Sequence, residues 1–247
     1  MTKYKLVVLM DVPEDLYGEW ADWNRDHARD MVNAGFISGQ TFKVRPDYEG
    51  NHPEALPFVP PYSMVNIYEV DEPMLETMLL TKTPEMGQGP AGGSRPFPSP
   101  LGKHMGDGYL LEPDSEAFHS KAVEEDLTRY RLVLMMDVPV DLLDEWKTWN
   151  RDHARDLAQV PGFISAQSYT VRDDYAHIHP ESLPDRPPYK VAVIFEVNEH
   201  ALESMLRKRP AVGQEPEAGT RTFPSPLGKH LGDGFLLEPI GEEYRKP

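Results

Sequence analysis

The chain has 247 residues, which is enough for one large domain or two small ones. Its formal net charge of −16 argues against nucleic acid and anionic membrane surfaces as partners. It contains no cysteine, which excludes disulfides, zinc–cysteine sites, iron–sulfur clusters and thiol nucleophiles. No apolar run approaches the ~18 residues of a membrane helix, and the N-terminal segment has the pattern of a strand rather than a signal peptide. We therefore expect a cytoplasmic protein.

Most of the chain is duplicated at a displacement of 126 or 127 residues, which indicates two copies of one structural unit. The matching segments are Tyr4–Leu16 with Tyr130–Leu142, His52–Tyr62 with His179–Tyr189, and Phe97–Pro113 with Phe223–Pro239. We expect a first repeat over residues 1–113, a polar and acidic linker over 114–129, and a second repeat over 130–247.

The first copy has the pattern strand, helix, strand, strand, helix, strand. In chain order we expect a buried strand over Lys5–Met10, a helix capped by Asp11 and ending near Val32, an alternating strand over Phe36–Val44, a strand over Tyr62–Val70, a short helix over Glu72–Leu80 and a brief strand over Tyr109–Leu111. This order is that of the ferredoxin-like fold. The sequence thus predicts an α+β protein in which two tandem ferredoxin-like repeats form one barrel, with a cavity between sheet and helices.

The octapeptide WNRDHARD occurs in both copies, over Trp23–Asp30 and Trp149–Asp156. Helical spacing places its histidine on the apolar face of the first helix of each copy, with the asparagine on the flank of that face. The residues concerned are Trp20, Trp23, Asn24 and His27 in the first copy and Trp146, Trp149, Asn150 and His153 in the second.

An apolar environment keeps an imidazole neutral, which suits a general base, although a core histidine bonded to a carbonyl would show the same pattern. The arginines and aspartates of the octapeptide are expected to form ion pairs on a solvated helix face, Asp26 with Arg29 and Asp152 with Arg155, each stabilising by only ~0.3 kcal/mol.

The segment Trp149–Tyr169, WNRDHARDLAQVPGFISAQSY, resembles the EthD-like and related families of dimeric α+β barrel proteins. Trp23–Phe42 has the same pattern with Ala34 in place of the proline, so the second copy fits better. The resemblance implies that His27 and His153, with the two asparagines, face a pocket between sheet and helices. Such proteins include isomerases, cofactor-free oxygenases, polyketide cyclases, dehydratases and haem-handling enzymes, so the reaction stays open.

Further histidines and lysines are repeated in loops and are candidates for substrate binding or for a lid that brings a cation near the pocket. They are His52 and His179, Lys103 with His104, and Lys229 with His230. The alternative is that these loop residues are only solvated. A metal triad of His27, His52 and His104 lacks close ligand spacing, so we expect no metal and no cofactor.

Together these patterns predict a cofactor-independent enzyme of isomerase, cyclase or lyase type. His27 and His153 would transfer a proton, Asn24 and Asn150 would orient them or hold an oxyanion, and the four tryptophans would line the pockets. The substrate would be a mostly apolar small molecule with a carbonyl or phenol group. The alternatives are a haem- or metal-dependent oxidative enzyme with histidine ligands, and a non-catalytic protein that binds a hydrophobic metabolite. Assembly of several copies into a homo-oligomer is compatible with each of these functions.

Overall fold

A computed structural model describes residues 2–47, 62–76, 98, 105–120, 127–175, 187–202, 224 and 231–247. The elements of repeat 1 are β1 (Lys3–Asp11), α1 (Tyr17–Ala34), β2 (Ser38–Val44), β3 (Met64–Asp71), α2 (Glu72–Met74), β4 (Met105–Pro113) and β5 (Phe118–His119). Those of repeat 2 are β6 (Tyr130–Asp137), α3 (Leu143–Leu157), β7 (Phe163–Val171), β8 (Val191–Val197), α4 (Glu199–Ala201), β9 (Leu231–Pro239) and β10 (Tyr244–Arg245).

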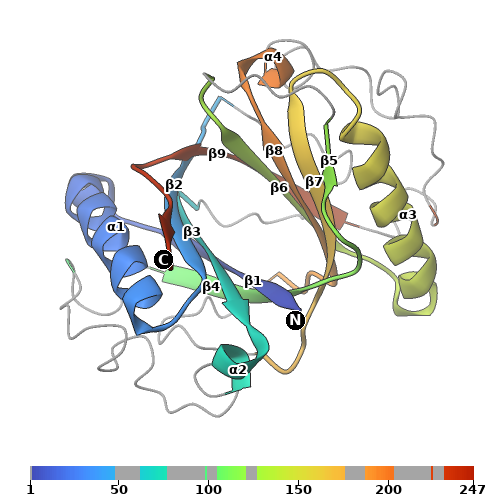
Figure 1. The fold of residues 1–247 in the computed structure, drawn as a ribbon, viewed down its shortest axis with the longest axis horizontal. Helices are drawn as coiled ribbons and strands as arrows, with labels where there is room; N and C mark the ends of the chain where they lie inside the picture. Colours follow the sequence, from blue (N-terminus) through green and yellow to red (C-terminus); the bar gives the residue numbers. More distant parts are fainter. Residues whose placement is uncertain are drawn as a thin grey trace.

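Eight of the described strands close into one antiparallel barrel, in the order β2-β3-β1-β4-β7-β8-β6-β9 and back to β2. The two halves meet where β4 pairs with β7 and where β9 pairs with β2. Helices α1 and α3 cover the barrel from opposite sides (Figure 1). The predicted fold is therefore confirmed: one chain forms an α+β barrel of the kind that two chains form in dimeric α+β barrel proteins.

Strand alternation divides each half into an outer layer under a helix and an inner layer inside the barrel. On β1, Leu6 and Met10 contact the helix layer, while Val7 and Leu9 belong to the core inside the barrel. Both faces are buried, which explains why this strand has a nearly continuous apolar sequence. The interior core contains residues from both repeats, among them Tyr62, Tyr109, Val133, Tyr169, Tyr189 and Phe235.

The first helix begins later than predicted. Pro13 has an extended backbone (φ −57°, ψ 134°), and a 3₁₀ turn over Glu14–Leu16 precedes α1, so Asp11 does not cap the helix. Asp11 instead ends β1. The helix ends at Ala34 because Gly35 adopts φ 128°, a left-handed conformation that favours glycine.

Other boundaries also differ from the sequence-based ones. Strand β2 begins at Ser38 rather than Phe36, and β4 is longer than the brief strand expected. Only Glu72–Met74 of the predicted second helix is assigned to α2, and its predicted end lies outside the described residues.

The C-terminal tail of each repeat joins the sheet of the other repeat. Strand β5, within the segment predicted as a linker, pairs with β7, and β10 pairs with β2. Side chains repeat the exchange, because Gln167 donates to the carbonyl of Ser115 at 2.7 Å and Gln40 donates to that of Gly241 at 3.3 Å. Each repeat therefore completes the edge of the other.

Within the described residues, no helix combines the length and hydropathy needed to cross a membrane.

Candidate functional site

Both histidines of the repeated octapeptide stack on a tryptophan of their own helix, four residues earlier. The ring centroids of Trp23 and His27 are 4.6 Å apart with planes 20° from parallel, and those of Trp149 and His153 are 4.7 Å apart at 16°. The i,i+4 spacing on a helix produces this contact. The same sequence therefore builds the same local geometry twice.

The two histidines differ in exposure. His27 is half-buried, whereas only 4% of His153 is exposed. The imidazole of His27 is therefore the more accessible of the two.

A second tryptophan anchors each helix to its sheet. Trp20 and Trp146 are completely buried, next to Met64 and Val191 on the strands below. They meet the octapeptide tryptophans edge to face, at centroid distances of 5.5 and 5.3 Å. Their burial indicates a packing role.

The octapeptide asparagine of repeat 1 is fixed by three polar contacts or close approaches. Its amide nitrogen donates to the Trp20 carbonyl at 2.9 Å and approaches the Met64 sulfur at 3.0 Å. Its amide oxygen accepts from Asn66 of β3 at 2.5 Å. Asn24 and Asn66 are both buried, so the pair fixes the helix against the sheet by a polar contact.

The asparagine of repeat 2 has a different environment. Asn150 is also fully buried, and its amide nitrogen donates to the Ala192 carbonyl at 2.9 Å. The residue that corresponds to Asn66 is Val193, which cannot donate a hydrogen bond. Among the described residues, the amide oxygen of Asn150 has no hydrogen-bond partner.

The strand below the histidine differs in the same way. Tyr68 meets the His27 ring edge to face at 6.4 Å, and Phe195 meets the His153 ring in the same manner at 6.3 Å. The Tyr68 hydroxyl is buried beside Asn66, and burial raises the pKa of this phenol well above its usual value. On the strand that faces the octapeptide helix, repeat 1 thus has an amide and a phenol where repeat 2 has hydrocarbon side chains, Val193 and Phe195.

Two buried tyrosine–aspartate pairs lie inside the barrel and were not predicted as site residues. Tyr62 donates to Asp107 at 2.7 Å, and Tyr189 donates to Asp233 at 2.5 Å. Burial raises the pKa of the Asp233 carboxyl, and burial followed by the charge of Asp233 raises the pKa of Tyr189. The repeated PPY and GDG segments, which contain these residues, were the available sequence signal.

Several predicted site residues lie outside the described residues, so the structure does not test them: His52, His179, Lys103, His104, Lys229 and His230. Of the metal triad that the sequence argued against, His52 and His104 belong to this group. Within the part of the chain that is described, no three His, Asp or Glu side chains are placed to hold a metal ion. The predicted ion pairs are confirmed, because Arg29 contacts Asp26 at 3.1 Å and Arg155 contacts Asp152 at 3.1 Å.

The barrel is similar to several solved structures. An anthrone oxidase-like protein aligns with 99% of this chain and 93% of its own at 12% identity, with a TM-score of 0.60. Two proteins described as putative monooxygenases, from Lactobacillus acidophilus and Fusobacterium nucleatum, align with the whole chain and with 97% and 99% of their own at 14% and 11% identity, each with a TM-score of 0.52. No protein-family model and no curated protein sequence matches the chain. At such low identity these likenesses establish the dimeric α+β barrel fold, and they do not single out the EthD-like proteins.

Proposed function

We propose that this protein is a small-molecule enzyme whose reactive site lies at His27, between α1 and the outer face of the sheet in repeat 1. The observation that carries the proposal is the polar set around this half-buried histidine. Tyr68 meets the His27 ring and Asn66 of the same strand hydrogen-bonds to Asn24, whereas the corresponding strand residues of repeat 2, Val193 and Phe195, are apolar. The resemblance to EthD-like proteins fits Trp149–Tyr169 better and by itself favours His153, so the choice of His27 rests on its greater exposure and on the polar strand residues beside it.

The chemistry that this set favours is removal of a proton from an apolar aromatic molecule with a phenol or carbonyl group. His27 would act as the base, held in place by its stack on Trp23. The Tyr68 hydroxyl is protonated at neutral pH, and because the side chain is buried against the His27 ring, Tyr68 would act as a positioning residue for the imidazole rather than as a donor to the substrate. Asn24 would act as a positioning residue, because it holds Asn66 beside that hydroxyl.

The fate of the resulting anion defines the reaction class. The likeness to an anthrone oxidase-like protein supports oxidation over the isomerase, cyclase and lyase chemistry expected from sequence. In such an oxidation a CH₂ group and O₂ give a C=O group and water. The substrate supplies all four electrons, one oxygen atom enters the product and the other leaves as water. No external reductant is needed, which is consistent with a cofactor-independent enzyme.

The direct test separates proton removal from oxidation. Anthrone, whose methylene protons are acidic, is incubated with the protein in D₂O without oxygen, and methylene deuteration is followed by NMR. We expect catalysed exchange, an about 10²–10⁴-fold loss in His27→Ala, and little change in the matched variant His153→Ala. Equal losses in both variants, or none in His27→Ala, would contradict the proposed site.

The same protein then distinguishes the alternatives. Admission of oxygen should give stoichiometric O₂ uptake and ketone formation. A Soret band or stoichiometric iron in the purified protein would instead support the haem- or metal-dependent alternative. Saturable anthrone binding with neither exchange nor O₂ uptake would support a non-catalytic binding protein.

A further inference from the structure

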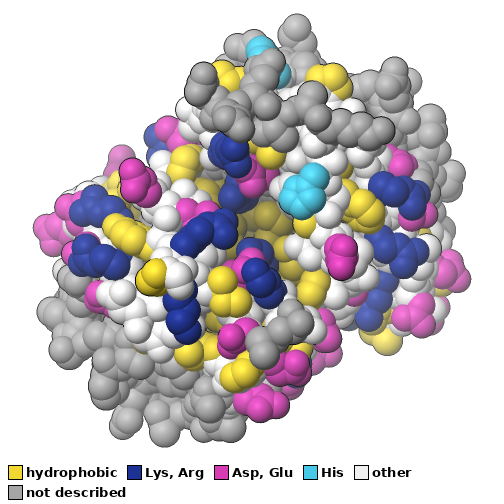
Figure 2. Space-filling model, in the orientation of Figure 1, with side chains coloured by type: hydrophobic (Ala, Val, Ile, Leu, Met, Phe, Trp, Pro, Cys, Tyr) yellow, Lys and Arg dark blue, Asp and Glu magenta, His cyan; other side chains and the backbone are white. Residues whose placement is uncertain are grey.

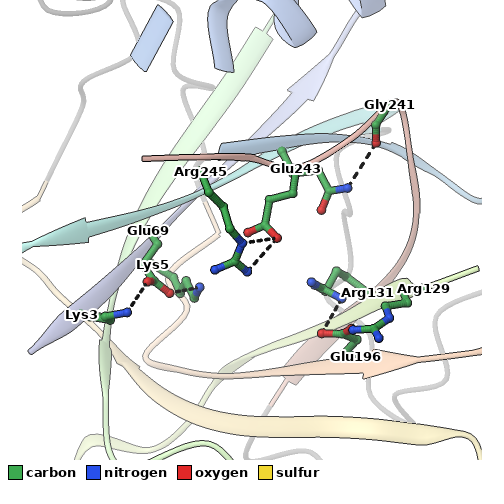
Figure 3. Close-up of polar contacts among 10 residues, drawn as sticks. Lys3, Lys5, Glu69, Arg129, Arg131, Glu196, Gly241, Glu243 and Arg245 are labelled. Carbon is green, nitrogen blue, oxygen red and sulfur yellow. Dashed lines mark hydrogen bonds and ion pairs between the residues drawn. The ribbon is translucent and has the colours of Figure 1, made fainter. Parts of the chain in front are cut away.

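One end of the barrel gathers cationic side chains from both repeats, on the inner face of the sheet and so on the opposite face from the His27 site. We call the group of Lys3, Lys5, Arg129, Arg131 and Arg245 the cationic mouth (Figure 3). We propose that the cationic mouth binds the oxyanion of a small molecule, namely a carboxylate, sulfate or phosphate group. The proposal is independent of the function assigned to His27.

Strand register assembles the first half of the mouth. Arg245 of β10 lies opposite Ser38, Ser38 lies opposite Glu69, and Glu69 lies opposite Lys5. These four positions form one row across four neighbouring strands. Because paired residues share a face of the sheet, the row faces the barrel interior with Lys5, two residues before Val7 of the core. Arg245 and Lys5 come from different repeats, so the fold brings them together.

The second half repeats this arrangement around Arg131. Arg131 lies opposite Glu196 on β8 and opposite Leu237 of the interior core on β9. Burial raises the pKa of the nearby Tyr169 hydroxyl, an effect that Glu69 of repeat 1 reinforces and Arg131 of repeat 2 opposes. Glu69 and Arg131 are therefore both close enough to influence the pKa of Tyr169, a residue of the interior core. The two halves of the cationic mouth thus lie near the same part of the barrel interior.

The carboxylates of the mouth hold its cations in place but do not neutralise them all. Glu69 contacts Lys3 at 3.0 Å and Lys5 at 2.6 Å. Glu196 likewise contacts Arg129 and Arg131, each at 2.9 Å. Burial alone would raise the pKa of Glu69, yet the two lysines lower it, so this carboxylate is ionised at neutral pH.

In each cluster two cations share one carboxylate at ion-pair distance. Asp71 lies opposite Lys3 and adds a second acid near the first cluster, so the positive excess is clearest at Arg129 and Arg131. The C-terminal Arg245 is paired with Glu243 at 2.8 Å, and in Figure 3 it lies on the same side of the barrel end as Lys5 and Arg131. In a chain of net charge −16, a local positive excess is a departure from the average surface. Counter-ions of opposite sign concentrate at such a place.

The shape of this face suits a ligand headgroup. Figure 2 shows Lys and Arg side chains grouped around a hollow, with hydrophobic side chains at its bottom. The core residues next to the mouth, Leu111 and Leu237, are completely buried, so the hollow stops above the barrel core. Both Arg129 and Arg131 contact Glu196 through Nη1 alone, and a guanidinium has five N–H donors in a fork that matches oxyanions. A compact headgroup fits these features better than a long apolar chain.

The test is calorimetric titration of the full chain at low ionic strength with three anions: inorganic phosphate, sulfate and benzoate. Benzyl alcohol serves as the neutral analogue of benzoate. We expect binding of at least one anion, none of benzyl alcohol, and weaker binding as salt is added, since salt screens exposed charges. Tighter binding of benzoate would identify an organic carboxylate as the ligand class, and tighter binding of phosphate or sulfate would identify a phosphate or sulfate group.

Variants make the result specific. Arg131→Gln should weaken binding about fivefold, which is the effect of losing one partly exposed charge, and Lys5→Gln/Arg131→Gln should weaken it further. Lys43→Gln is the matched control, because Lys43 is also paired with a carboxylate, Glu238 at 3.2 Å, but lies on the other face of its strand. Its affinity should equal that of the wild type.

A fold control keeps the test decisive. Lys3→Ala/Arg129→Ala removes the more exposed cation of each cluster and leaves the Lys5–Glu69 and Arg131–Glu196 pairs intact, so this variant should fold and bind the anion more weakly than wild type. Circular dichroism verifies the fold of every variant. No binding of any anion by the wild type, or equal weakening in Lys43→Gln, would overturn the proposal.

Discussion

The layers under α1 and α3 have the same octapeptide and nearly the same tryptophan–histidine stack, yet they offer different chemistry. In repeat 1 the facing strand contributes Asn66 and Tyr68, and in repeat 2 it contributes Val193 and Phe195. The helix therefore determines where the imidazole lies, and the strand below determines which polar groups surround it. A motif that is kept in both copies is therefore informative about geometry, whereas the chemistry around it depends on the partner strand.

The largest expected effect comes from replacing the two polar strand residues of repeat 1 with their counterparts in repeat 2. Asn66→Val/Tyr68→Phe should lower turnover about 10²-fold, because it removes the polar groups proposed to position His27. The fold should persist, because repeat 2 already packs valine and phenylalanine at these positions. Steady-state kinetics and thermal unfolding measure the two effects. Unchanged turnover would show that Asn66 and Tyr68 have no part in the reaction.

The reverse exchange tests the same comparison through stability. Val193→Asn/Phe195→Tyr places an amide and a hydroxyl in an apolar layer and should cost about 1–3 kcal/mol, unless Asn150 accepts from the new amide as Asn24 does. Urea unfolding provides the free energy. Adding Asn150→Ala to this double variant makes the test more specific. If the changes in unfolding free energy do not add, the new amide pairs with Asn150.

The two asparagines should differ in cost when truncated. Asn24→Ala removes a partner from the buried Asn66 amide and should destabilise by about 2–3 kcal/mol. Asn150→Ala removes one bond to a backbone carbonyl and should cost about 1 kcal/mol. Equal unfolding free energies for the two variants would show that the Asn24–Asn66 hydrogen bond does not stabilise the fold.

The smallest effect concerns the interior aspartates and appears as a pH dependence. Because the pKa of Asp233 is raised in the folded protein, its stabilising contribution is complete below the ordinary aspartate pKa and is lost as pH rises through the folded value. Asp233→Asn, which resembles the protonated carboxyl, should therefore be more stable than wild type at neutral pH. The difference should shrink on acidification. The free energy of unfolding in urea, measured from neutral to acidic pH, tests this prediction. A variant less stable than wild type at neutral pH would contradict it.

Sequence patterns sufficed for the fold because period-2 alternation and the order of elements are local properties. The start of α1 was predicted wrongly because a proline near a helix start is compatible both with the first helical turn and with the extended residue and 3₁₀ turn observed here. The roles of Asn66 and Tyr68 could not be read from the sequence, because they depend on contacts between residues 42 positions apart. Asp107 and Asp233 were hidden for another reason, since a GDG sequence is typical of a turn, whereas here it lies in strands β4 and β9.

The exchange of tails has a consequence for how the chain is made. Strand β2 is flanked by β3 on one side and by β9 and β10 on the other, and the latter two are translated long after it. At about 5–20 residues per second, the ribosome needs roughly ten to forty seconds between β2 and β10. During that time the hydrogen-bonding groups along one side of β2 have no partner from β9 or β10. The nascent N-terminal half is thus an open-edged intermediate, the stage at which a chaperone or a second nascent chain would compete with the native strand.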